Sequence, residues 1–153
     1  PPIELAVFRC RPSVWRVFAP HHYLTGSLSP ASRCFAAVWE GRPVALCSTV
    51  SLIGRKGHRR VSRLVTLPDY QGIGIGSALL GAVAGLHSEQ GHRVSITTSH
   101  PAMIGHLRRN AGWRAARVKR AGTRGSRRFS GIYRDSAGRA VVSFEYRGGA
   151  GSV

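Results

Sequence analysis

The chain is 153 residues long and 42% of its residues are hydrophobic, which is enough to bury one globular core. Its 23 Lys and Arg outnumber 6 Asp and Glu, so the formal net charge is +17 and a polyanion is the natural partner. No apolar run is long enough to span a bilayer, and the first residues lack the order of a secretion signal. We therefore expect a soluble protein of the cytoplasm rather than a membrane or secreted one.

The composition predicts a single domain over residues 1–147 and a flexible Gly and Ser tail over residues 148–153. Cys10, Cys34 and Cys47 are odd in number and lie far apart in apolar surroundings. This pattern favours reduced thiols in the core over disulfides or a zinc cluster.

The first third of the chain is typical of three strands and one short helix. Runs of β-branched and apolar residues predict the strands, and Glu40-Gly41-Arg42 predicts a turn between the second and the third. The strands are expected over residues 3–10, 34–39 and 43–53, and the helix over residues 14–18.

A strand over residues 61–66 runs into a glycine-rich turn that opens a helix near Ser77. Gly72, Gly74 and Gly76 let the backbone approach a ligand closely, and the N–H groups there point along the dipole of the helix. The helix is predicted by apolar residues at helical spacing, namely Ala78, Leu79, Ala82, Val83 and Leu86. This arrangement predicts a site for a pyrophosphate.

Two other phosphate-binding loops match the turn badly. A P-loop needs Lys followed by Ser or Thr after its last glycine, whereas Gly76 is followed by Ser77-Ala78. A dinucleotide fingerprint needs the spacing G-x-G-x-x-G and an acidic residue after the next strand, but no carboxylate follows the strand over residues 94–98. A nucleoside triphosphate and a nicotinamide cofactor are therefore both disfavoured.

The run Gln71-Gly72-Ile73-Gly74-Ile75-Gly76 matches the signature Q/R-x-x-G-x-G/A, and over residues 60–113 the chain resembles the GNAT acyltransferase superfamily. The resemblance implies an α/β (α+β) fold, in which a mixed central sheet is splayed at the acyl-coenzyme A loop and flanked by helices. It also implies an acyltransferase that uses acetyl-CoA or another acyl-CoA. The residues expected to bind this cofactor are Val65, Leu67, Gln71, Gly72, Ile73, Gly74, Ile75, Gly76 and Ser77.

The C-terminal part predicts one more helix and two closing strands. Pro101 can open the helix, which runs to about Asn110 before Gly112 ends it. The closing strands are expected over residues 128–134 and 140–147, joined by a turn over residues 135–138.

The residues expected to transfer protons match the pattern of the superfamily less well than the glycine-rich turn does. Many members of the superfamily place a Tyr on the last long helix to protonate the departing thiolate, in a segment that ends in Gly and an aromatic residue. Gly112-Trp113 matches that ending, but residues 103–113 contain no Tyr and the position falls on His106 or Leu107. His106 is the candidate acid because imidazole titrates near neutrality, with an ordinary surface role as the alternative. None of the 6 carboxylates stands out as the base.

His21, His22 and Tyr23 follow the first helix and place two imidazoles and a phenol together. In GNAT folds this segment borders the acceptor site, so His22 and Tyr23 are candidate catalytic residues; alternatively Tyr23 packs and the histidines cap or face solvent. His22-Tyr23 also resembles the His-Tyr pair of phage Mom-type DNA-modification proteins, and residues 99–104 look like related sequences. That resemblance implies modification of the exocyclic amine of adenine, iron as a further cofactor, and a bacterial or phage-infected host cell.

The basic residues concentrate in two clusters that we expect to contact DNA phosphates. One cluster lies in the hairpin before the glycine-rich turn, and the other in a predicted mobile loop over residues 114–128. The members are Arg55, Lys56, Arg59, Arg60, Arg117, Lys119, Arg120, Arg124, Arg127 and Arg128. The alternative is an arginine-biased composition with an ordinary solvated surface.

The sequence thus favours a GNAT-fold transferase that acts on nucleic acid, most specifically a Mom-type enzyme that alters the exocyclic amine of adenine. Such an enzyme must flip the base out of the duplex or act on a single strand, and contacts from basic loops offset that cost. Two alternatives stay open. One is an acetyl-CoA-dependent N-acetyltransferase of a small amine or a protein, and the other is a non-catalytic basic DNA-binding module.

Overall fold

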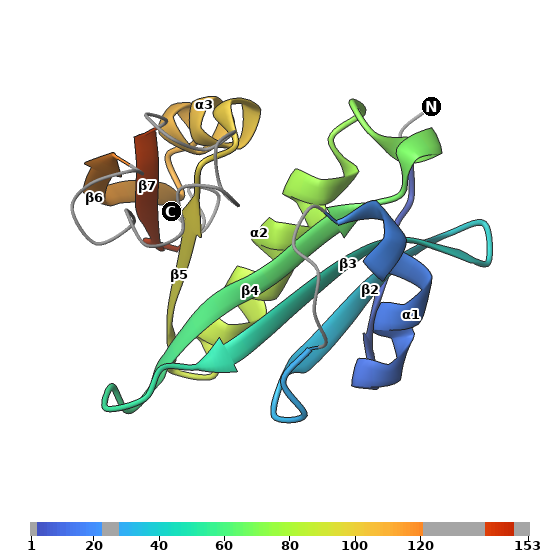
Figure 1. Cartoon of the computed structure of the whole chain (residues 1–153), viewed down its shortest axis with the longest axis horizontal. Helices are drawn as coiled ribbons and strands as arrows, with labels where there is room; N and C mark the ends of the chain where they lie inside the picture. The colour runs from blue at the N-terminus through green and yellow to red at the C-terminus, as the bar shows by residue number, and fades with distance from the viewer. Residues whose placement is uncertain (1–2, 23–27, 121–139, 149–153) are drawn as a thin grey trace, which may run out of the picture. The chain divides into compact units, whose positions relative to one another are not determined.

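The computed structural model describes residues 3–22, 28–120 and 140–148. These residues form seven strands and three α-helices, which confirms the predicted α/β class (Figure 1). The chain divides into two compact units, Pro1–Val94 and Ser95–Val153.

The described part of the first unit contains four complete strands, two α-helices and three short 3-10 turns. The strands are β1 (Ala6–Cys10), β2 (Arg33–Trp39), β3 (Arg42–Ser51) and β4 (His58–Thr66). The helices are α1 (Trp15–Phe18) and α2 (Ile75–Glu89), and the turns are η1 (Pro12–Val14), η2 (Ala19–His21) and η3 (Pro68–Tyr70). A further strand, β5 (Arg93–Thr98), begins in this unit, where the Arg93 N–H donates to the Gly57 carbonyl at 2.8 Å.

The four strands pair in chain order as an antiparallel sheet. The hairpin between β2 and β3 turns at Glu40 and Gly41, whose φ angles of 52° and 77° are both positive. Tight hairpin turns of this kind need a positive φ at both central residues. The predicted turn between these strands is therefore confirmed.

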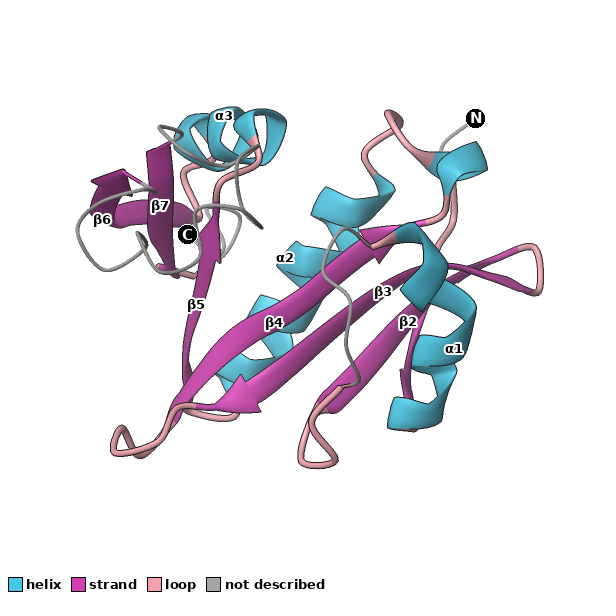
Figure 2. Ribbon diagram, viewed as in Figure 1, coloured by secondary structure: helices cyan, strands magenta, loops and turns pink. Residues whose placement is uncertain are grey.

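β2 and β3 are apolar along most of their length because helices cover both faces of the sheet. Successive side chains of a strand point to opposite faces, so Cys34 and Phe35 show which helix covers which face. Cys34 packs with Trp15 of α1, whereas the Phe35 ring lies 5.6 Å from the ring of His87 in α2. Figure 2 shows α1 and α2 on either side of these strands.

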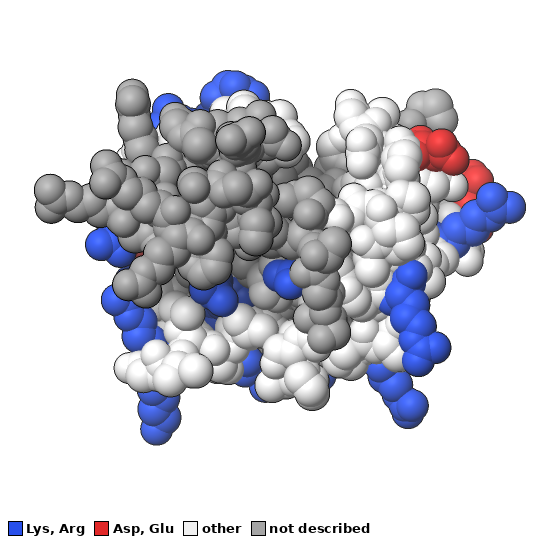
Figure 3. All heavy atoms as spheres, in the orientation of Figure 1, with Lys and Arg blue, Asp and Glu red and all other residues white. Residues whose placement is uncertain are grey.

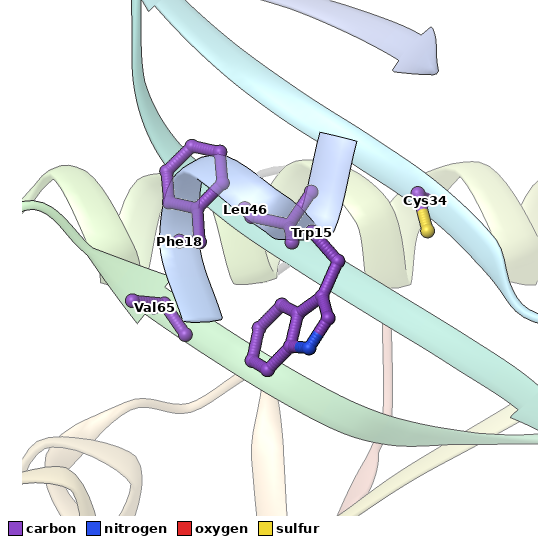
Figure 4. Packing of buried hydrophobic residues seen from close by; sticks show 5 residues of the cluster. All are labelled: Trp15, Phe18, Cys34, Leu46 and Val65. Atoms are coloured by element: carbon purple, nitrogen blue, oxygen red, sulfur yellow. The ribbon is translucent and has the colours of Figure 1, made fainter. Parts of the chain in front are cut away.

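The core on the α1 side is built around two aromatic residues of that helix. Figure 4 shows Trp15 and Phe18 lying over the strands that carry Cys34, Leu46 and Val65. Fully burying a large apolar side chain contributes about 1.5–3 kcal/mol. A helix as short as α1 does not form alone in water, so this packing holds it in place.

The core on the other face is formed by α2, whose buried residues are Ile75, Leu79, Leu80, Val83, Ala84 and His87. The predicted helix is confirmed, but of the apolar residues read from the sequence only Leu79 and Val83 are buried, whereas Ala78, Ala82 and Leu86 are exposed. It begins at Ile75, two residues before the expected start.

The described residues of the second unit form one helix and two strands besides the rest of β5. β7 (Ala140–Tyr146) pairs antiparallel with β5 on one side and with β6 (Trp113–Arg120) on the other. α3 (Pro101–Arg109) starts after His100, whose Nδ1 accepts a hydrogen bond from the Met103 N–H at 3.4 Å. The predicted helix at Pro101 and the last strand are thereby confirmed.

The mobile loop predicted over residues 114–128 is wrong in its first part, because β6 extends to Arg120. β6 pairs with β7 over this length, with Val118 opposite Val142, and the Trp113 ring lies 5.1 Å from that of Tyr146. The side chains of Arg114 and Arg117 are exposed. A strand with one face open to solvent accommodates such charges. The run of arginines therefore resembled a loop in the sequence, although it forms a strand.

Several predictions concern residues that the structure does not describe. The strand over residues 128–134, the turn over residues 135–138 and most of the tail lie outside the described ranges. Within those ranges, no helix has the length and apolarity needed to cross a membrane.

Candidate functional site

The glycine-rich turn is fixed at its entrance by the end of β4. Tyr70 in η3 packs its ring against Trp39, with 5.8 Å between the ring centroids. The next residue, Gln71, donates from Nε2 to the Thr66 carbonyl at 2.9 Å. The chain therefore enters the turn from two anchored residues.

Gly72 and Gly74 adopt conformations that favour glycine. Their φ angles are 82° and 88°, in the left-handed region, and a Cβ built on either residue would meet nothing within 4 Å. The absence of a neighbour means that a side chain would project into open space beside the backbone. The positive φ angles account for glycine in the turn, and the open space leaves room for the predicted approach of a ligand.

The backbone at the start of α2 offers hydrogen-bond donors. Gly74 is the N-cap and supplies no side-chain cap, and its carbonyl accepts the hydrogen bond of the Ala78 N–H at 3.0 Å. The N–H groups of Ile75, Gly76 and Ser77 precede that bond and have no partner within a helix of this geometry. A helix N-terminus with uncapped N–H groups attracts anions.

Gly76 also has a packing role that the sequence did not indicate. A Cβ at this residue would lie 2.8 Å from Thr66 Oγ1, closer than real Cβ atoms come. Gly76 therefore lets the first turn of α2 pack against the end of β4. Among the residues expected to bind the cofactor, Ile75 and Val65 are buried, whereas Ile73 is exposed.

These residues fit the pyrophosphate of an acyl-CoA. The turn presents glycine backbone without side chains, and the helix that follows presents N–H groups and the positive end of its dipole. Gln71 through Ser77 would hold the pyrophosphate. Leu67 continues from β4, and its own N–H already donates to the Val44 carbonyl at 2.9 Å.

A second group of candidate side chains meets at Trp15 in the same unit. The His22 ring lies 5.5 Å from the Trp15 ring in an edge-on contact, and the guanidinium carbon of Arg63 lies 5.8 Å from its centroid. Arg63 donates from one terminal nitrogen to the Ser62 carbonyl at 2.8 Å, while its Nε is buried and bonds to no described residue. Tyr23 lies outside the described ranges.

Arg63 was missed as a site residue by the sequence reasoning, although a signal was present. It stands in β4 between residues that are apolar or small, and two positions before the buried Val65. Charged residues are rarely enclosed without a partner. An arginine at an inward position of a covered strand is therefore a candidate for ligand binding.

His106 lies in the second unit, in α3, directly before the buried Leu107. It is partly buried, and no tyrosine occurs in this helix. His22 and the glycine-rich turn belong to the first unit.

The predicted nucleic-acid contacts are placed in several different elements. Arg55 and Lys56 are exposed in the turn before β4, and Arg60 is exposed on β4 itself. Arg59 differs from its neighbours, because it is buried at 8% exposure. In Figure 3 blue Lys and Arg atoms recur around the visible face, and the red acidic atoms that stand out lie at the upper right.

The remaining predicted nucleic-acid contacts belong to the C-terminal part of the chain. Arg117 is exposed on β6, and the backbone of Lys119 and Arg120 continues that strand. Arg124, Arg127 and Arg128 lie outside the described ranges.

No described group of three or more His, Cys, Asp or Glu is placed to hold a metal ion, so the expected iron finds no support there. Cys34 and Cys47 are buried, and Cys10 is partly buried. Burial raises the pKa of the Cys34 thiol to about 11 and that of Cys47 to about 12. Thiols in this state are poor nucleophiles at neutral pH.

The fold is shared with solved acetyltransferase structures. An IAA acetyltransferase from Bacillus cereus ATCC 14579 is 14% identical, with a TM-score of 0.67 over 94% of this chain and 99% of that one. The ribosomal-protein-S18-alanine N-acetyltransferase from Escherichia coli is also 14% identical, with a TM-score of 0.69 over 94% and 93%. A GNAT family acetyltransferase from Elizabethkingia anophelis with acetyl-CoA bound is 11% identical, with a TM-score of 0.65 over 93% and 97%.

No curated protein sequence matches the chain. The sequence model of the acetyltransferase (GNAT) family matches residues 5–112, which include the whole glycine-rich turn and the helices α1 to α3. That match covers well over half of the chain. With its mixed α/β fold and its glycine-rich turn at the start of α2, the chain belongs to the GNAT family of acetyltransferases.

Proposed function

We propose that the chain transfers an acyl group from acyl-CoA to an amine, with the pyrophosphate of the coenzyme bound at the start of α2. The observation that carries this proposal is the uncapped N-terminus of α2 beside Gly72 and Gly74, both at positive φ. When bound, acyl-CoA supplies a thioester whose acyl group passes to the nitrogen of the acceptor.

The chain's own groups have three tasks in this reaction. The N–H groups of Ile75, Gly76 and Ser77 bind and orient the coenzyme through its phosphates. His22 and Tyr23 are proposed to line the acceptor side, where an imidazole can accept the proton that the amine loses. His106 is proposed as the proton donor for the thiolate, in place of the tyrosine that α3 lacks.

The acceptor is proposed to be an amine on a small molecule or a protein. One of the similar structures is named as an enzyme that acetylates an alanine of ribosomal protein S18, which is a protein acceptor. The buried Nε of Arg63, which bonds to no described residue, would donate to an anionic group of such an acceptor.

Nucleic acid is the second candidate acceptor, and the net charge of +17 favours it. Phosphate contacts from Lys and Arg give affinity without reading sequence. In its most specific form this candidate is a Mom-type modification of the exocyclic amine of adenine. A chain that binds nucleic acid and the coenzyme without turnover would instead be a non-catalytic binding module.

Substitutions at Ser77 test the coenzyme site. Ser77 stands in the first turn of α2, where a carboxylate stabilises a helix but repels a bound pyrophosphate. We expect Ser77→Glu to weaken coenzyme A binding at least tenfold relative to the similarly sized, uncharged Ser77→Gln, as measured by isothermal titration calorimetry. Equal affinities for the two variants would contradict the proposed site.

Thiol release from acetyl-CoA then separates the acceptors. The assay is run with a panel of small amines, with an N-terminal peptide, and with single-stranded DNA whose nucleosides are analysed by mass spectrometry. A mass increase on deoxyadenosine that requires the protein supports the nucleic-acid candidate. Turnover of an amine or peptide alone supports the first candidate, and coenzyme binding without any turnover contradicts both.

A further inference from the structure

Three arginines from three strands lie on the face of the sheet that α2 covers. Arg33 of β2 is opposite Thr49, which shares a hydrogen bond with His87 of α2. Arg59 of β4 is opposite Ser51, two residues along the same face from Thr49, and donates to its hydroxyl at 2.6 Å.

Arg9 of β1 completes this arrangement. It is opposite Phe35, whose ring contacts His87 on the same face. Arg9 and Arg33 also lower the pKa of Arg59, after the burial of Arg59 itself, so the three charges lie within electrostatic reach of one another. We call Arg9, Arg33 and Arg59 the arginine triad.

The triad lacks a counter-charge within the described residues. No described carboxylate forms an ion pair with any of the three, and the charges that act on Arg59 are positive ones. Nearby, burial and then the charge of Arg59 lower the pKa of His87 to about 4, so this imidazole is neutral and does not balance the arginines. Like charges gathered around a buried guanidinium cost free energy unless an anion joins them.

The C-terminal end of α2 does not balance the triad. A helix C-terminus carries about half an elementary negative charge, and the effect falls off within one turn. The triad carries three full positive charges, of which Arg59 is 8% exposed while Arg9 is exposed and Arg33 partly so. An anion from solution can therefore reach Arg9 and Arg33, and the buried Arg59 adds its positive charge to the site.

The triad is separate from the glycine-rich turn. The turn lies at the start of α2, whereas His87 stands near its end, and 15 residues of helix span about 22 Å. A coenzyme pyrophosphate at the first turn thus leaves the triad open. Anion binding at the triad is independent of which amine the protein acylates.

We propose that Arg9, Arg33 and Arg59 form a second anion site that binds phosphate groups. The planar guanidinium fork matches the oxygens of phosphate, and arginine is the residue that best provides two parallel hydrogen bonds to it. The three side chains come from strands β1, β2 and β4, which lie across about 14 Å of sheet. A row of this length suits the successive phosphates of a nucleic-acid backbone better than a single ion.

The test removes the two accessible arginines and leaves the buried Arg59 in place, because its guanidinium supports the fold. Arg9→Gln/Arg33→Gln is compared with Arg16→Gln/Arg42→Gln, which removes two exposed arginines outside the triad and gives the same net charge. The probes are a fluorescent single-stranded DNA of about twelve nucleotides, followed by anisotropy, and inorganic phosphate, followed by calorimetry. Excess coenzyme A is present throughout, and thermal unfolding checks that both variants are folded.

We expect the triad variant to bind the oligonucleotide about tenfold more weakly, and the control variant to bind almost as the parent does. Each lost phosphate contact lowers the slope of log affinity against log salt by about 0.7, so the triad variant should lose about 1.4. If inorganic phosphate binds and needs the triad while the oligonucleotide does not, the site takes a free phosphate. Equal losses in both variants, or no loss with either probe, would overturn the proposal.

Discussion

Thr49 of β3 and His87 of α2 share a buried hydrogen bond of 3.0 Å between the threonine hydroxyl and the imidazole Nε2. Burial is the main reason that the pKa of His87 falls to about 4, with the charge of Arg59 as the next cause. The imidazole is therefore neutral in the folded protein at neutral pH. It is part of the contact between α2 and the sheet rather than a free titrating group.

The first prediction concerns stability against pH. The unfolded chain protonates His87 near pH 6.5, before the folded chain does, so unfolding is favoured as the pH falls. The contribution is complete above about pH 6.5 and lost as the pH falls towards 4, and it amounts to roughly 3 kcal/mol. Urea unfolding of the parent and of His87→Gln at several pH values measures it. If the free energy of unfolding changes with pH in the same way in both proteins, His87 is not responsible for the loss of stability.

The second prediction concerns the core under α1. Leu46 is 0% exposed and Leu86, on the outer face of α2, is 40% exposed. We expect Leu46→Ala to lower the free energy of unfolding by about 2–5 kcal/mol, because it leaves a cavity beside Trp15 and Phe18. Leu86→Ala makes the same chemical change at the surface and should cost well under half as much. Similar losses in chemical denaturation would contradict the packing described.

The third prediction concerns the conformation of the glycine-rich turn. Gly74→Ala forces an L residue into a φ of 88°, whereas Gly81→Ala adds the same methyl group within α2 without that constraint. We expect Gly74→Ala to lower stability by about 1 kcal/mol and to weaken coenzyme A binding, since it moves the N–H groups of the first turn. Gly81→Ala should be neutral or stabilising. Calorimetry and thermal unfolding compare them, and unchanged binding in Gly74→Ala would argue against the proposed role.

The fourth prediction separates the acceptor side from the coenzyme side. We expect His22→Ala to lower kcat for acyl transfer at least tenfold while the affinity for coenzyme A stays within about twofold. The neighbouring His21 is exposed at the end of η2, so His21→Ala is the matched control and should keep nearly full activity. A fully active His22→Ala variant would remove His22 from the mechanism.

The glycine-rich turn was predictable because its signals are local. A strand, three glycines and an apolar helical pattern follow one another within residues 61–86, and each signal has a direct backbone cause. The role of Gly76 was not predictable in the same way, because its close approach to Thr66 joins residues that are ten positions apart.

The arginine triad lies beyond sequence reasoning for a similar reason. Arg9, Arg33 and Arg59 come from three strands, and only the register of the sheet brings them to one face. From the sequence, Arg59 was grouped with its exposed neighbours in the hairpin. β6 was not predicted, because its charged residues obscure the alternation of apolar and polar residues that is typical of a strand. Its pairing with β7 defines it better than its composition does.

Thr66 is tied to the glycine-rich turn twice, through its carbonyl to Gln71 and through its hydroxyl beside Gly76. These ties keep the turn ordered before any ligand arrives, so little conformational entropy is lost on association. We then expect coenzyme A to bind to a turn that already has its final conformation. The association rate should not be limited by a rearrangement of the turn. Substitutions of Thr66 should mainly alter the lifetime of the complex with coenzyme A.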